Sequence, residues 1–122
     1  MSDDSLATDP LICLRDSLRT FAAERDWDQF HSPKNLAVAL CIEAAELLQN
    51  FQWMSDDQST TLPAEMLARV RDEMADVLLY LIRLADKLDV KLIEAAESKI
   101  QLNALRYPVE KARGSSKKYT DL

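Results

Sequence analysis

Two pairs of acidic residues stand on segments that are otherwise apolar. Glu43 and Glu46 are three residues apart, and Glu73 and Asp76 repeat that spacing further along the chain. Residues with this spacing share one face of a helix, so each pair projects from a single face. Burying unpaired carboxylates is costly, and each buried acid raises the pKa of its neighbours. A divalent cation offsets that cost where carboxylates converge between helices, so the two pairs together predict a metal site, although a solvated face is the alternative for either pair alone.

The identity of the metal is narrowed by the scarcity of histidine. His31 is the single histidine of the chain. It cannot supply the paired Glu-x-x-His motifs of a di-iron bundle, nor a histidine-rich zinc site. Carboxylate and water oxygens suit Mg²⁺, with Mn²⁺ as a substitute, and such a site keeps open positions for substrate phosphates.

A stripe of polar and cationic side chains follows the acids. Lys99, Asn103 and Arg106 fall on one face of the last expected helix. Such side chains bind phosphate oxygens through charge and amide donors, although an ordinary solvated helix face is the alternative. Beside a carboxylate–metal cluster, the stripe predicts chemistry on a polyphosphate.

Aromatic side chains gather at the ends of the expected helices. Trp27 lies close in sequence to His31, and Trp53 follows the second helix. A tryptophan at the rim of a pocket can stack on a planar base, whereas packing in the core or at an oligomer interface is the alternative. Together with the phosphate-binding stripe, these residues make a nucleotide the candidate ligand.

The composition limits the class of protein. The chain has 122 residues, enough for one domain, and a net charge of −6, which disfavours a general nucleic-acid binder. A single glycine argues for helices and few tight turns. The first residues lack the features of a signal peptide, and no apolar run is long enough to span a membrane. We expect a cytoplasmic protein that binds neither nucleic acid nor membrane.

Capping residues and apolar spacing predict four helices that carry these side chains. They are expected at about residues 10–25, 33–51, 64–87 and 91–106. The second is apolar almost all round, which predicts a central, buried helix, and residues 55–63 are expected to form a loop. Short connections favour an all-α fold, an antiparallel four-helix bundle that assembles into a homo-oligomer. The expected division is a disordered leader (1–8), a helical domain (9–107) and a basic C-terminal tail (108–122).

The sequence resembles a known family at these same residues. The two acidic pairs match the ExxE…ExxD pattern of the MazG-like, all-α nucleoside triphosphate pyrophosphohydrolases. Longer segments are similar to the dCTP pyrophosphatase-like branch of that superfamily. They are FAAERDWDQFHSPKNL (21–36), EAAELLQNFQW (43–53), DEMADVLLYLIRLADKL (72–88) and RYPVEKARGSSKKYTDL (106–122). The acid pattern alone is moderately specific, whereas its combination with these segments is highly specific.

The resemblance implies a homotetrameric, Mg²⁺-dependent enzyme that cleans the nucleotide pool. It would hydrolyse a deoxynucleoside triphosphate, dCTP or a modified dCTP, to the monophosphate and pyrophosphate. Carried over by position, the metal-binding and catalytic residues would be Glu43, Glu46, Glu73 and Asp76. The substrate contacts would be Trp27, His31, Trp53, Tyr80, Lys99, Asn103 and Arg106. Water would attack phosphorus directly, with Glu43 or Glu46 acting either as general base or purely as a ligand.

Two other functions compete with the enzyme. The same bundle could hold a nucleotide or Mg²⁺ as a non-catalytic sensor. Alternatively, the chain could be a helical oligomer scaffold whose acids are neutralised by Arg69, Arg71 or Arg83. The intact set of acids favours turnover, and the scaffold predicts no dependence on metal.

Overall fold

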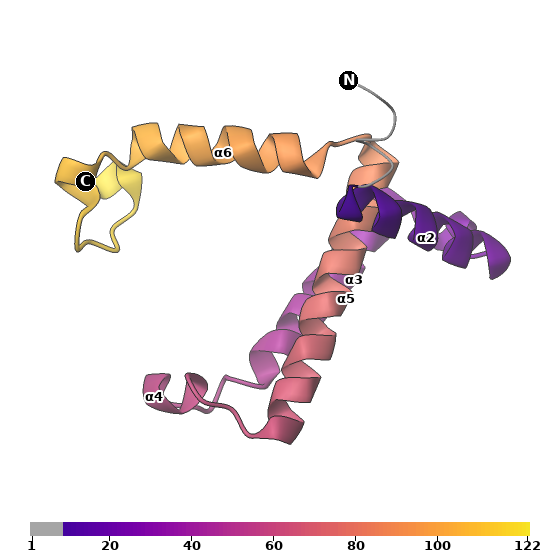
Figure 1. Cartoon of the computed structure of the whole chain (residues 1–122), viewed down its shortest axis with the longest axis horizontal. Coiled ribbons are helices and arrows are strands. Elements are labelled where there is room, and N and C mark those ends of the chain that lie inside the picture. Colours follow the sequence, from indigo (N-terminus) through magenta and orange to yellow (C-terminus); the bar gives the residue numbers. More distant parts are fainter. Residues whose placement is uncertain (1–8) are drawn as a thin grey trace. The chain divides into compact units, whose positions relative to one another are not determined.

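The computed structural model describes residues 9–122, and every regular element in that range is helical (Figure 1). The elements are α2 (Pro10–Glu24), η1 (Asp28–Phe30), α3 (Pro33–Gln49), α4 (Asp56–Ser59), α5 (Ala64–Leu88), α6 (Leu92–Arg106), α7 (Val109–Ala112) and η2 (Tyr119–Asp121). The predicted leader lies outside the described residues. The all-α prediction is confirmed for the described part, in which no helix is both long enough and apolar enough to traverse a bilayer.

Side-chain caps begin the two N-terminal helices where the sequence predicts. The carboxylate of Asp9 accepts a hydrogen bond from the amide of Leu11 at 2.9 Å, and proline follows at the first helical position. The hydroxyl of Ser32 accepts from the amide of Asn35 at 3.1 Å, again directly before a proline. The caps thereby fix the residues at which α2 and α3 begin, and so the position of each side chain along these helices.

The segment 55–63 is not a plain loop, contrary to the prediction. It contains α4, which begins with a reciprocal capping box between Ser55 and Gln58. This pattern of serine followed three residues later by glutamine is a helix-start signal that was present in the sequence. A helix of one turn lacks apolar periodicity, which explains why the pattern of hydrophobic residues does not reveal it.

The chain divides into two compact units, one ending at Asp89 and the other covering Val90–Leu122. In the first unit, α3 packs along α5, and α2 also contacts α5 (Figure 1). The side chains buried in this packing are Ala22, Leu36, Val70, Ile82 and Ala85. The last helix of the unit, α5, ends at Leu88, and the φ of 54° of its C-cap residue Asp89 lies in the left-handed region. The second unit comprises α6, α7 and η2, in which the rings of Tyr107 and Tyr119 meet edge to face.

The expectation of a buried second helix is wrong for a single chain. Only Leu36 of α3 is buried, while Val38 and Ile42 are about half exposed and Leu48 is 61% exposed. The physical reason is that the chain lays one helix, α5, along α3, and one neighbour covers only one stripe of a helix that is apolar on several sides.

Candidate active site

Three carboxylates meet between α3 and α5. Oxygen atoms of Glu43, Glu73 and Asp76 all lie within 4.8 Å of one another. The first comes from α3, and the other two lie one turn apart on α5. The three-residue spacing puts each pair on one face of its helix. The helices α3 and α5 pack along each other (Figure 1), and the carboxylate oxygens show that these faces meet.

The cluster is electrostatically unsatisfied. Oε2 of Glu43 and Oε2 of Glu73 are buried without a hydrogen-bond partner among the described residues. Within residues 9–122, no salt bridge reaches any of the four predicted acids. Burial raises the pKa of Glu43 to about 7, and hydrogen bonding with Glu73 and Glu46 and the charge of Asp76 act in the same direction. The scaffold alternative requires arginines to neutralise these acids, and no arginine among the described residues does so.

A divalent cation fits this donor set. Carboxylate oxygens are the ligands that Mg²⁺ and Mn²⁺ prefer, and two buried oxygens without partners are atoms that a cation would satisfy. A cation would also favour the charged form of Glu43 and so lower its pKa. Glu46 lies outside the triad, but it influences the pKa of Glu43, so the four predicted acids act as one electrostatic unit.

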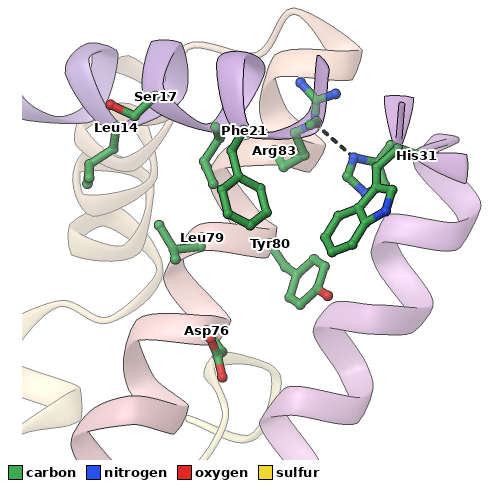
Figure 2. Close-up of a pocket in the computed structure, with 11 residues that line it drawn as sticks. Leu14, Ser17, Phe21, His31, Asp76, Leu79, Tyr80 and Arg83 are labelled. Carbon is green, nitrogen blue, oxygen red and sulfur yellow. Dashed lines mark hydrogen bonds between the residues drawn. The ribbon is translucent and has the colours of Figure 1, made fainter. Parts of the chain in front are cut away.

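An apolar cavity of about 420 Å³ lies beside the cluster, between α2, the connector that follows it and α5. Asp76 lines this cavity and is also a member of the carboxylate triad, so the two features share a wall. Tyr80 follows one turn later on α5, and Phe21 projects from α2 (Figure 2). The rings of Phe21 and Trp27 meet edge to face at 5.6 Å. A planar, mostly apolar group is the ligand that such a wall favours.

One turn beyond Tyr80 on α5, the side chain of Arg83 meets polar side chains of the connector that follows α2. The guanidinium of Arg83, which is 6% exposed, donates from Nε to Nδ1 of His31 at 3.1 Å (Figure 2). It also donates from Nη2 to Asp28 at 2.6 Å. Burial lowers the pKa of His31, and the positive charges of Arg83 and Lys87 lower it further.

The structure brings together some of the predicted site residues and not others. Trp27, His31, Tyr80 and Asp76 line one cavity. Trp53 is 88% exposed and does not line that cavity. The predicted phosphate contacts, Lys99, Asn103 and Arg106, belong to α6 in the second unit, where the guanidinium of Arg106 lies 4.6 Å from the centre of the Tyr119 ring.

Several residues of the cavity were not predicted. The sequence suggests Arg83 only as a counter-ion for the acids, whereas the structure shows it in contact with His31 and Asp28. Leu14, Ser17 and Phe21 of α2 line the cavity as well. Apolar spacing predicts a helix over about residues 10–25, but such spacing does not separate a cavity wall from a packed core.

Comparison with known proteins places this geometry in a family. The model of the MazG-like family matches residues 38–122, which include both acidic pairs. A protein named dCTP pyrophosphatase 1 from Mus musculus is 49% identical over 104 residues, which are 84% of this chain and 61% of the mouse protein. The protein of the same name from Homo sapiens is 48% identical over 105 residues, with the same shares. The chain thus spans about three-fifths of the length of these relatives.

A solved structure agrees with the same assignment. A pyrophosphatase from Archaeoglobus fulgidus DSM 4304 superposes with a TM-score of 0.71 and is 44% identical in sequence. The match covers 78% of this chain and 89% of the archaeal chain. Identity at this level over most of both chains indicates common descent as well as a common fold.

Proposed function

This chain belongs to the MazG-like family, and we propose that it hydrolyses a deoxynucleoside triphosphate between the α and β phosphates, releasing the monophosphate and pyrophosphate. The observation that carries the proposal is a carboxylate cluster with two unpartnered buried oxygens that shares Asp76 with an aromatic cavity. The cluster suits a cation that binds phosphates, and the cavity suits a base. dCTP or a modified dCTP is the proposed substrate, supported by the names of the mouse and human relatives.

The four acids have the role of holding Mg²⁺, or Mn²⁺ in its place. They are Glu43, Glu46, Glu73 and Asp76. When bound, the cation neutralises phosphate charge and makes phosphorus more open to attack. The acids themselves hold the attacking water in line and take its proton through a carboxylate of the α3 pair. No covalent nucleophile is required, so pyrophosphate leaves in a single displacement.

The other predicted residues would bind the substrate. Trp27, His31 and Tyr80 would contact the base and sugar, because they line the cavity next to Asp76. Trp53 is proposed as a further contact to the base, and its exposed ring is free to stack. The α6 stripe of Lys99, Asn103 and Arg106 is proposed to contact the phosphates.

Replacing Trp53 with alanine tests its role as a stacking residue. We expect the affinity for a whole deoxynucleoside triphosphate to fall by roughly tenfold, the scale of one base stacked on an aromatic ring. The affinity for inorganic triphosphate should stay at the wild-type value, because that ligand has no base. Isothermal titration with both ligands measures the difference, and an equal loss for both would assign the ring to packing.

We also propose that the chain works as a cytoplasmic homotetramer in which the helical domain (9–107) completes a four-helix bundle. Support comes from the apolar side chains that one chain leaves uncovered on α3 and α5. They include Val38, Ile42, Leu48, Leu67 and Met74. Exposed apolar surface of this extent is typical of subunit interfaces. The segment 108–122 is proposed as a basic tail beside the phosphates.

A substrate panel tests the proposed function. The purified full chain is incubated with each canonical deoxynucleoside and ribonucleoside triphosphate and with modified dCTP, in the presence of Mg²⁺, and pyrophosphate and orthophosphate are assayed separately. We expect pyrophosphate, with dCTP or a modified dCTP as the best substrate. Release of orthophosphate would contradict cleavage between the α and β phosphates. A folded protein that binds nucleotide without any release would favour the sensor.

A further inference from the structure

The buried guanidinium of Arg83 is placed between two different surroundings. On one side it lines the apolar cavity with Tyr80 and Phe21. On the other it lines a charged hollow that also contains Arg19, Asp86 and Lys87, where positive and negative side chains face each other. A fully buried cation is retained only where its hydrogen bonds are satisfied, so the partners of Arg83 define what it does.

Those partners fix the orientation of the guanidinium. Asp28 accepts from Nη2 at 2.6 Å and also accepts from Lys87, while Asp86 lies 3.7 Å from Nη1. With its outer nitrogens held by these acids, Arg83 points Nε at Nδ1 of His31, 3.1 Å away (Figure 2).

This contact determines the tautomer of the imidazole. An arginine Nε always carries a hydrogen, so the Nδ1 it approaches must be the unprotonated acceptor. A neutral imidazole then has its hydrogen on Nε2. Burial and the nearby charges of Arg83 and Lys87 favour the neutral ring, and only Asp28 opposes them. Among residues 9–122, Nε2 of His31 has no hydrogen-bond partner, and the ring lines the cavity.

We propose that Arg83 is a positioning residue that holds His31 as the Nε2–H tautomer, so that the cavity recognises its nucleotide through a fixed N–H donor. The matching ligand feature is a hydrogen-bond acceptor on the base or sugar. The assignment of the tautomer stands on the contacts of this chain alone, whereas its role in substrate recognition rests on the proposed function.

The tautomer can be measured without any substrate. Because His31 is the single histidine, ¹⁵N labelling of histidine gives one pair of ring signals in a long-range proton–nitrogen correlation spectrum of the full chain. In the wild-type protein we expect Nδ1 at the shift of an unprotonated ring nitrogen and Nε2 at that of a protonated one. A protonated Nδ1, or fast exchange between both forms, would overturn the proposal.

Two lysine substitutions separate the effect of Arg83 from that of charge. Arg83→Lys keeps a cation but removes the Nε donor, and we expect both tautomers to be populated. Arg19→Lys is the matched control, because Arg19 binds Asp86 in the same charged hollow and makes no contact with His31. Unchanged tautomer signals in a folded Arg83→Lys protein would remove Arg83 from its role. If that variant does not fold, the wild-type spectrum still decides which tautomer His31 adopts.

Two substitutions of His31 test the donor itself in the hydrolysis assay. In His31→Gln the amide nitrogen can reach the position of Nε2, whereas in His31→Asn the amide oxygen replaces Nδ1 and the distal donor is lost. We expect His31→Asn to raise KM by roughly three- to tenfold, the effect of one hydrogen bond, with little change in kcat. His31→Gln should stay nearer to wild type. Equal KM values in the two variants would contradict the donor.

A substrate without sugar hydroxyls identifies which acceptor is read. With 2′,3′-dideoxycytidine triphosphate, the ratio of the KM of His31→Asn to the KM of wild type should fall to one if the acceptor is a sugar hydroxyl. It should persist if the acceptor is on the base. If no nucleotide is hydrolysed at all, the proposed function fails while the tautomer measurement remains valid, so the two failures are distinguishable.

Discussion

The helix α5 carries acidic side chains in two regions that treat them in opposite ways. In its N-terminal half, Glu73 and Asp76 meet Glu43 of α3, and the buried oxygens there have no partner among the described residues. Near its C-terminal end, Asp86 accepts hydrogen bonds from Nε and Nη2 of Arg19, at 2.7 Å and 2.5 Å. The second arrangement lowers the pKa of its acid, whereas the first raises the pKa of Glu43.

The difference separates acids that stabilise the fold from acids whose charge the described side chains leave uncompensated. A carboxylate paired with arginine contributes to stability at neutral pH, because the fold favours its charged form. Carboxylates grouped without counter-ions oppose folding, and a protein retains them where something else supplies the charge. The same helix therefore joins a stabilising ion-pair network to a cluster of unpaired acids, which we propose binds a cation.

Removing one charge of the cluster should change activity more than any other substitution considered below. Glu73→Gln should lower the rate of pyrophosphate release by roughly 100- to 1,000-fold, the scale for a group that acts on transition-state charge. It should also raise the Tm of the metal-free protein, because like-charge repulsion is relieved. Glu65→Gln, an acid in the first turn of the same helix, is the control and should match wild type in both assays. An active Glu73→Gln enzyme would remove the cluster from catalysis.

The pH dependence of stability sharpens the same contrast. The folded state raises the pKa of Glu43 from 4.5 to about 7, so it binds a proton more tightly than the unfolded state does. The metal-free protein should therefore lose stability as pH rises between these two values and then level off. Thermal melts in EDTA across this range measure the loss, and added Mg²⁺ should restore Tm at the upper end. A metal-free Tm that does not fall over this range relative to that of Glu43→Gln, which lacks the titrating acid but keeps His31, would contradict the assignment.

Removing the acid that is paired with Arg19, Asp86, should lower stability and leave catalysis unchanged, the reverse of the effect of Glu73→Gln. Asp86→Asn is expected to lower the free energy of unfolding by about 1 kcal/mol, while the kcat for pyrophosphate release stays close to wild type. The pKa of Asp86 is lowered chiefly by its hydrogen bond with Arg19, so its contribution is present above pH 4 or so and is lost as pH falls further. Urea denaturation of both proteins at neutral and acidic pH checks both statements. A variant that is inactive but fully stable would exchange the roles of the two regions.

The smallest effect is expected at the exposed edge of the network. Lys87→Met removes one of two cations that bind Asp28, whose side chain is 61% exposed. Water and the remaining bond to Arg83 compensate, so Tm should fall by less than in Asp86→Asn. High salt should abolish the difference from wild type, because exposed pairs are screened. A loss larger than that of Asp86→Asn would show that Asp28 depends on Lys87 rather than on Arg83.

Local signals explain which parts of the molecule could be predicted from the sequence. Asp9 and Ser32 cap helices that begin where expected, and the three-residue spacing of the acids already implied one shared face on each helix. The short helix α4 was not predicted, because a helix of one turn has no apolar periodicity. The burial of α3 was overestimated, because the sequence shows that Ile42 and Leu48 are apolar but not whether the same chain covers them.

The contact between Arg83 and His31 had no sequence signal. The two residues are 52 positions apart, and neither belongs to a repeated spacing. Arg83 is one cation in a helix that contains several, and its burial follows from the crossing of α2 over α5 rather than from its neighbours in sequence. Tertiary packing selects it, so only the structure reveals it.

Direct binding of Mn²⁺ tests whether the unpaired cluster is held for a divalent cation. Electron paramagnetic resonance of free Mn²⁺, titrated with wild type, Glu73→Gln and Asp86→Asn in the presence of a non-hydrolysable dCTP analogue, counts the bound ion. We expect wild type and Asp86→Asn to bind Mn²⁺ alike and Glu73→Gln to bind it far more weakly. Equal binding by all three folded proteins would contradict the claim that these carboxylates form the metal site.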